Sequence, residues 1–324
     1  MRKGVKRWLW YGLSLALAVG ILAVLLGRQR WADFSQTLGA VDGRWLAGVV
    51  VLAGVYWLVR TARWRWMTSL EEAGVGWPTA WVSMLAGLGV GLITPLRSGE
   101  VVRPMFVPRG ARMRLAGLVV IERMFDLSAV LTLCILGVFY MVFAGGVKLA
   151  GGATLPPWLL LACPPLLAVA LGVPLLVHFR PARLWALLSR ALPGKAKELA
   201  EVRLDRRQFV IFFLTSMLSE SLSVLTVYFC LQAYGEIDLL TACALAPVVM
   251  LHNILPATPG GFGIRESLAV AVFGLMKLPG LSQAAILAAY LTNPIILLVI
   301  PGAVGVGGAW VAGVIRQIEA EAAG

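Results

Sequence analysis

The chain has 324 residues, of which 60% are hydrophobic and 14% are charged. Soluble domains are about 45–50% apolar and about 25% charged, so this composition excludes an ordinary water-soluble protein. Repeated apolar runs are long enough to cross the roughly 30 Å hydrocarbon core of a bilayer as helices. We therefore expect an all-α, polytopic membrane protein in which residues 1–324 form one transmembrane domain.

The formal net charge of +12 has a simple explanation in a membrane protein. Lys and Arg accumulate in cytoplasmic loops and near anionic lipid head groups, so nucleic acid is not expected as a partner. The cysteines lie in apolar runs without the short paired spacing of a metal site, and the sequence has only two histidines. We expect neither a metal ion nor another cofactor.

Six apolar runs are predicted to cross the bilayer completely. They cover residues 8–26, 45–59, 115–143, 156–177, 209–233 and 284–312. The runs at 79–93, 239–256 and 264–276 are shorter and adjoin Pro or Gly, which is typical of broken or re-entrant helices. The prediction is about six full crossings and two opposed re-entrant elements.

The distribution of basic residues predicts the orientation of these helices. With both termini in the cytoplasm, most Lys and Arg fall on the cytoplasmic side, as expected in the cell membrane. The basic segment 179–207 is either a helix on the cytoplasmic membrane surface or a solvated loop. Residues 60–66, with three arginines, allow the same two interpretations.

Two Thr-Pro segments far apart in the chain resemble each other. Thr94-Pro95 is followed by Gly99 and Glu100, and Thr258-Pro259 is followed by Gly263 and Glu266. Thr before Pro is typical of a helix N-terminus, which favours anions such as phosphate. Interrupted segments at corresponding positions indicate a transporter-like inverted repeat, with halves of roughly 1–150 and 151–324. The alternative is that both segments, here called the first and second elbows, are surface turns.

Charged residues in and beside the membrane helices are candidates for substrate binding, because such groups are costly in hydrocarbon unless paired. Glu100 and Arg103 have the spacing of a helical ion pair, and Glu122 and Asp126 share a helix face. The alternative for Glu122, Arg123 and Asp126 is an interfacial salt-bridge cluster. The candidate residues are Arg97, Gly99, Glu100, Arg103, Glu122, Arg123, Asp126, Glu220, Asn253, Gly260, Gly261, Gly263, Arg265 and Glu266.

Three motifs resemble those of the lysylphosphatidylglycerol synthase transmembrane family, also called flippase-like integral membrane proteins. They are Pro95-Leu-Arg-Ser-Gly-Glu100-Val-Val-Arg103, Glu122-Arg123-Met-Phe-Asp126-Leu and Pro259-Gly-Gly-Phe-Gly-Ile-Arg-Glu266. The resemblance implies a stand-alone member that moves lipids between leaflets, without the aminoacyl-transferase domain of some relatives. Arg265, beside the family-type Glu266, is interpreted as individual to this chain.

The leading functional hypothesis is a lipid translocator whose elbows form a polar cavity near the bilayer midplane. In it Arg97, Arg103 and Arg265 would receive a lipid phosphate, while Glu100 and Glu266 would balance charge or carry protons. The alternatives are a membrane-embedded transferase acting on a lipid phosphate and a non-transporting assembly partner, alone or as an oligomer. An enzyme is not favoured, because no nucleophile–base pair or nucleotide-binding loop is recognisable.

Glu220 and Glu266 allow two interpretations. A carboxyl group in an apolar setting favours its neutral form, which would make both residues candidates for proton coupling. If instead each is ionised and paired, for example with Arg123 or Arg265, its role is structural.

Overall fold

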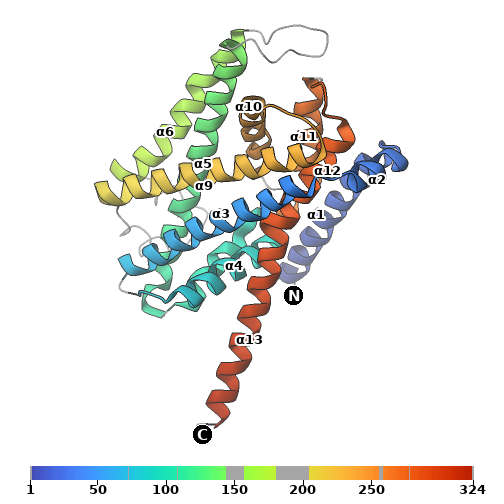
Figure 1. Cartoon of the computed structure of the whole chain (residues 1–324). Helices are drawn as coiled ribbons and strands as arrows, with labels where there is room; N and C mark the ends of the chain where they lie inside the picture. The colour runs from blue at the N-terminus through green and yellow to red at the C-terminus, as the bar shows by residue number, and fades with distance from the viewer. Residues whose placement is uncertain are drawn as a thin grey trace.

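The computed structural model describes residues 2–71, 73–107, 109–143, 157–179, 204–254, 258–276 and 278–322. Every regular element in these ranges is helical (Figure 1), which confirms the all-α membrane class. The α-helices are α1 (Arg2–Gly27), α2 (Trp31–Gly39), α3 (Gly43–Leu70), α4 (Trp77–Ile93), α5 (Arg112–Phe143), α6 (Cys163–Phe179), α9 (Arg206–Tyr234), α10 (Leu239–Met250), α11 (Ile264–Leu275), α12 (Gln283–Pro294) and α13 (Ile300–Ala322). The short 3₁₀ helices are η1 (Pro95–Phe106), η2 (Arg109–Ala111), η3 (Pro157–Ala162), η4 (Leu251–Ile254) and η5 (Pro259–Gly261), and η6 (Ile295–Val299) is a π-helical turn.

Within the described residues, four helical stretches are long and apolar enough to cross a membrane: α3, α5, α9 and the continuous stretch Gln283–Gly313. A fifth is reached if α1 and α2, which meet at 95°, count as one broken span. The expected crossing at 156–177 is represented by η3 and the 17-residue α6. Most of the basic segment 179–207 lies outside the described residues.

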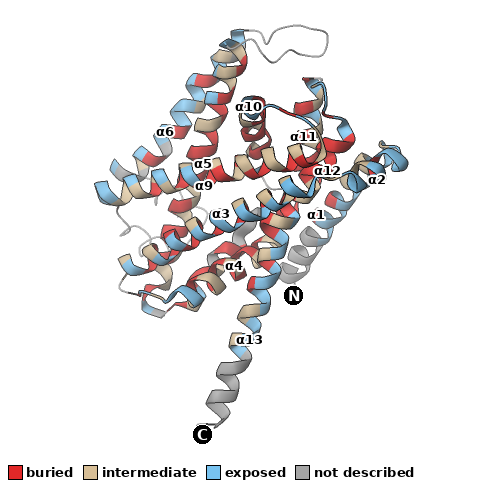
Figure 2. Ribbon diagram, viewed as in Figure 1, coloured by how far each residue is buried: buried red, intermediate tan, exposed pale blue. Residues whose placement is uncertain are grey.

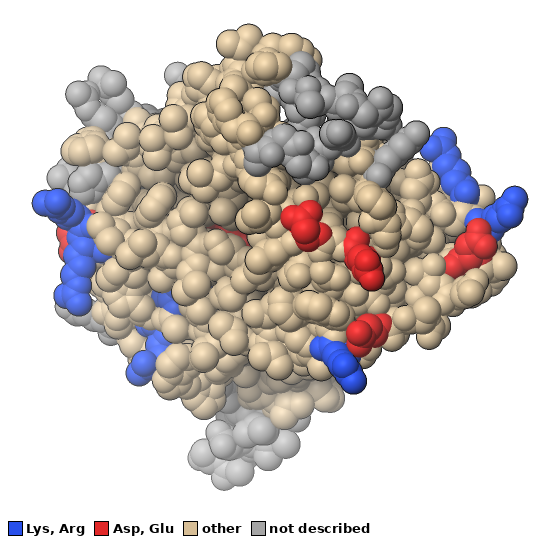
Figure 3. Space-filling view, turned by 45° about the horizontal axis from the view of Figure 1, so that its top comes forward, with Lys and Arg blue, Asp and Glu red and all other residues tan. Residues whose placement is uncertain are grey.

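The outer surface of the helices is apolar and the polar side chains face inward. On α9, Leu214 and Leu218 are 59% and 49% exposed, whereas Ser216, Ser219 and Glu220 are buried. Figure 2 shows that other helices also have a buried face and an exposed face, and the face in Figure 3 has few charged side chains. This pattern is the reverse of a soluble protein and fits a helix bundle whose solvent is lipid.

Two large apolar clusters pack the interior of the bundle. One cluster includes Trp64 and Phe125 and packs α3, α4, α5 and the start of α9. The other includes Leu245 and Phe273 and packs α9, α10, α11 and α12. On α5 and α9 the acidic residues lie next to members of the first cluster, and the second cluster begins further along both helices, at Val130 and Val224, so the candidate site is inside the bundle.

The two elbows begin as the sequence predicts but are stabilised differently. Thr94 and Thr258 are extended and precede Pro at the first helical position, yet neither hydroxyl caps the following helix. Thr94 Oγ1 accepts a hydrogen bond from the Gly99 amide at 2.8 Å, and Thr258 Oγ1 donates to the Phe262 carbonyl at 2.8 Å. The first elbow continues as the 3₁₀ helix η1, whereas the second leads into the α-helix α11.

Close packing of α4 against α13 depends on glycines. A Cβ atom on Gly89 would lie 2.5 Å from the Gly302 carbonyl oxygen, and one on Gly305 would overlap the backbone of Leu85 and Ala86. Small residues at such contacts let transmembrane helices approach closely, which increases their van der Waals attraction. This contact holds α4, and with it the first elbow, in place.

We predict that Gly305→Val separates α4 from α13 and lowers the thermal stability of the purified protein. Overpacking of this kind costs about 1–3 kcal/mol. Gly307→Val is the matched control, because nothing lies within 4 Å of a Cβ atom at Gly307. Equal melting temperatures for the two variants in the same detergent would contradict the proposed helix contact.

Candidate functional site

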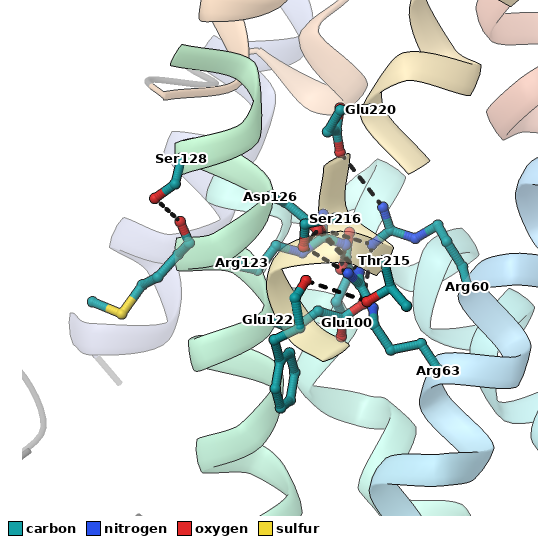
Figure 4. A network of polar contacts seen from close by, with 12 residues as sticks. Arg60, Arg63, Glu100, Glu122, Arg123, Asp126, Ser128, Thr215, Ser216 and Glu220 are labelled. Carbon is teal, nitrogen blue, oxygen red and sulfur yellow. Dashed lines mark hydrogen bonds and ion pairs between the residues drawn. The ribbon is translucent and has the colours of Figure 1, made fainter. Parts of the chain in front are cut away.

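Charged side chains from four elements, all but one of them buried, meet inside the bundle. The cations are two arginines of α3, one of η1 and one of α5, and the anions come from η1, α5 and α9 (Figure 4). We call this set the ion network: Arg60, Arg63, Arg103, Arg123, Glu100, Glu122, Asp126 and Glu220. Its four positive and four negative formal charges cancel.

Glu122 and Asp126 are the common acceptors of the ion network. They lie one turn apart on α5, so both carboxylates face α3. Arg63 approaches them at 2.5 Å and 3.0 Å, and Arg60 at 3.4 Å and 3.2 Å. The hydroxyl of Ser216 on α9 donates to Asp126 at 2.7 Å, which brings a third helix into the same contact.

The first elbow is bound to α5 through two ion pairs. Arg103 donates to Glu122 at 2.9 Å and to Glu100 at 2.6 Å, which confirms the pair expected from the spacing of Glu100 and Arg103. Arg123 contacts Glu100 and also pairs with Asp126 at 3.3 Å. The position of η1 therefore depends on α5.

Arg60 and Arg63 were not among the predicted site residues. The two interpretations of residues 60–66, a helix on the membrane surface and a solvated loop, are wrong for these two arginines. The helix expected to end at 59 continues to Leu70, and both side chains are at most 2% exposed. Arg60 and Arg63 are three residues apart, so they share the face of α3 that meets Glu122 and Asp126. Tyr56, one turn earlier, accepts a hydrogen bond from Arg60 at 3.0 Å.

A cavity of about 440 Å³ adjoins the ion network. Its charged wall includes Arg60, Glu100, Arg123, Asp126 and Glu220, and the remaining wall is mainly apolar. Its volume lies within the usual range of small-molecule sites. The cavity is therefore large enough for a head group of moderate size.

The second elbow also contributes to the wall of this cavity. Arg265 lines the cavity and binds Glu266 at 2.5 Å, while its guanidinium lies 5.0 Å from the ring centre of Phe262. Glu266 also accepts a hydrogen bond from the Gly263 amide at 2.6 Å and so caps α11. The pairing of Glu266 with Arg265 agrees with the ion-pair interpretation.

The glycines of the second elbow shape its backbone. Gly260, Gly261 and Gly263 have φ values of 59°, 76° and 85°, a region that residues with a Cβ rarely adopt. Gly99 has a different role, because a Cβ atom there would overlap the backbone of α4 at Val90. These glycines position the elbows and do not line the cavity.

Other predicted residues differ in their relation to the cavity. Asn253 lines it, but Arg103 is 1% exposed and lies behind Glu100 and Glu122. The side chain of Arg97 lies outside the described part of the chain. Tyr290 was not among the predicted site residues, but it lines the cavity, and its buried hydroxyl has no hydrogen-bond partner among the described residues.

The fold and site together define a multi-pass helical membrane protein with a buried, charged cavity between two interrupted segments. The sequence model of the lysylphosphatidylglycerol synthase transmembrane region matches residues 11–305, and the chain belongs to this family. Membership supports a membrane protein that acts on lipids. Comparison with curated proteins finds no match.

We predict that Glu122→Gln severely destabilises the protein. The substitution removes the common anion of three arginines, and breaking a buried ion pair on one side costs about 3–5 kcal/mol. Tyr290→Phe is a useful comparison, because it removes a buried polar atom that makes no hydrogen bond within the described structure. Thermal unfolding should show a large loss for Glu122→Gln and none for Tyr290→Phe. A wild-type melting temperature for Glu122→Gln would contradict the central role of this carboxylate.

Proposed function

We propose that this protein moves a lipid with an anionic or glycosylated phosphate head group between the leaflets, through the cavity between its elbows. The observation that supports this most directly is the position of a charged cavity halfway along the spanning helices. Glu220 is the middle residue of α9, and Asp126 is near the middle of α5. Such a cavity gives a head group a polar environment at the depth where hydrocarbon is most unfavourable.

The chemistry of the cavity favours a phosphate. Three arginines line it, and guanidinium groups bind phosphate oxygens in a geometry suited to two hydrogen bonds. Arg123 is the most accessible cation of the ion network, with its side chain 34% exposed. The apolar part of the wall would contact the region where the acyl chains join the head group.

Binding at Arg123 would couple the ligand to the first elbow. Arg123 contacts Glu100 of η1 as well as Asp126 of α5. A phosphate at Arg123 would compete with Glu100, whose other contact is Arg103. This exchange of partners offers a way for head-group binding to loosen η1 from α5 and open a path.

Charge balance suggests a coupled proton. The ion network and the Arg265–Glu266 pair are each neutral, so an anionic head group would add an unbalanced negative charge. Glu220 lines the cavity, and its ion-pair contact with Arg60 is long, at 3.9 Å. Protonation of Glu220 would restore neutrality when the anion binds. Glu266 is less suited to this role, because it binds Arg265 and caps α11.

We expect Arg123→Gln to reduce lipid translocation in liposomes at least tenfold. Loss of a hydrogen bond to a charged partner weakens binding by about 1.5–3 kcal/mol. The assay follows labelled anionic lipid from the inner leaflet to the outer leaflet. Arg114→Gln is the matched control, because Arg114 is 52% exposed and pairs with Glu71 outside the cavity.

The same liposomes distinguish the other candidate functions. Chemical conversion of the lipid without movement would indicate a transferase, and neither movement nor conversion by the wild-type protein would favour an assembly partner. Translocation by Arg123→Gln at the wild-type rate would contradict the role of this arginine in head-group binding.

A second prediction concerns the pH dependence of transport. If protonated Glu220 balances the bound anion, translocation of an anionic lipid should accelerate as the pH falls. Glu220→Gln mimics the protonated form, so this variant should fold and transport the anionic lipid. Its rate of transport should not depend on pH. A zwitterionic lipid in the same vesicles is the control, because it adds no net charge. An unchanged pH profile in Glu220→Gln would exclude this residue as the proton site.

The cytoplasmic position of both termini and the inverted relation of the two halves are part of the same proposal. In Figure 1 the free ends of α1 and α13 lie on the same side of the bundle, as a common compartment for the termini requires. Labelling of single cysteines by an impermeant reagent in intact cells would establish which side faces out.

A further inference from the structure

A second hollow lies on the outside of the bundle, between α1 and α11, and is separate from the ion network. Its volume is about 870 Å³, and most of its lining is apolar. Gly20 of α1 and Gly274 of α11 keep it open. A Cβ atom at Gly20 would have no neighbour within 4 Å, and a Cβ atom at Gly274 would have only the Gln283 amide nitrogen, at 3.8 Å. We call this hollow the α1–α11 groove.

The α1–α11 groove has one polar end. Arg28, just after α1, and Gln283, the first residue of α12, line this end. Arg28 is exposed, and the structure records no acidic partner for it within the described ranges. A cation at the end of an apolar groove is complementary to a molecule with an anionic head and an apolar tail.

The surroundings of Arg28 indicate the membrane interface. The chain turns by 95° between α1 and α2, and Trp31 at the start of α2 is 70% exposed. Exposed Trp and Arg beside the end of a spanning segment are typical of the head-group region. From Ala16 to Arg28 the helix rises about 18 Å, close to the depth of one leaflet in a hydrocarbon core of about 30 Å.

We propose that the α1–α11 groove binds a phospholipid of the bilayer, with an acyl chain along Gly20 and Gly274 and the phosphate at Arg28. The groove has the depth of one leaflet, an apolar wall at the level of the chain and a cation at the level of the phosphate. This site does not depend on the proposed transport function, since its lining shares no residue with the central cavity.

The position of the groove gives the bound lipid a structural consequence. The backbone of Gly263 in the second elbow packs against Ala18 and Ile21 of α1. The lipid would fill the space between the same two helices next to this contact. It would thereby hold α11, and the Arg265 side chain at its start, against α1.

Photo-crosslinking in nanodiscs tests this site. The probe is phosphatidylglycerol with a photoactivatable group on one acyl chain, and mass spectrometry identifies the crosslinked peptides. The expected result is labelling of α1 and α11 in the wild-type protein. Gly20→Leu, which fills the groove, should reduce this labelling at least fivefold. Gly12→Leu on the same helix is the matched control, because Gly12 does not line the groove and a Cβ atom there would meet nothing within 4 Å.

Two further outcomes decide the proposal. Arg28→Gln should reduce labelling by phosphatidylglycerol more than labelling by an uncharged diacylglycerol probe, because only the former has a phosphate. Equal labelling of α1 and α11 in the wild-type protein, Gly20→Leu and Arg28→Gln would overturn the site. A dimer that dissociates on Gly20→Leu without any lipid crosslink would also overturn it, since the groove would then bind a second copy of the chain.

Discussion

The pairing of Glu122 and Asp126 with the arginines of α3, η1 and α5 is the constraint on which the arrangement of the helices depends. Neither carboxylate nor guanidinium tolerates isolation in a hydrocarbon environment, so the elements that carry them must meet. Arg60 and Arg63 bring α3 to α5, and Arg103 brings the first elbow to the same place. The apolar clusters then pack around the geometry that these charges specify.

A fully paired ion network would be a poor binding site, because every charge would already have its partner. The network has two members that differ from the rest. Arg123 has a partly exposed side chain, and Glu220 has a long contact with Arg60. Both line the cavity, whereas Glu122 and Arg103 lie behind them. The stable contacts are therefore in the interior, and the contacts that a ligand could exchange are at the cavity wall.

Sequence patterns predicted the parts of this site that depend on spacing along one segment. The shared face of Glu122 and Asp126, the Glu100–Arg103 pair and the break at each Thr-Pro follow from helix geometry and proline chemistry. Arg60 and Arg63 were missed, because basic residues near the end of an apolar run normally indicate a loop. Arg60 and Arg63 are three residues apart and therefore share a helix face, which was the available signal. Their acidic partners, however, are about sixty positions away, beyond any local pattern. Likewise, Thr-Pro predicted where the elbows begin but not that Glu266 would cap α11.

Helix α11 connects the central cavity with the outer surface of the bundle. Its first turn places Arg265 on the cavity wall, and its later residues Ser267, Val270 and Gly274 line the α1–α11 groove. These three recur at helical spacing, so they form one stripe that faces α1. Because Glu266 caps α11 on the Gly263 amide, the second elbow and α11 form one hydrogen-bonded unit. A shift of α11 relative to α1 would therefore move Arg265 with it, so the width of the groove and the position of this cation cannot vary independently.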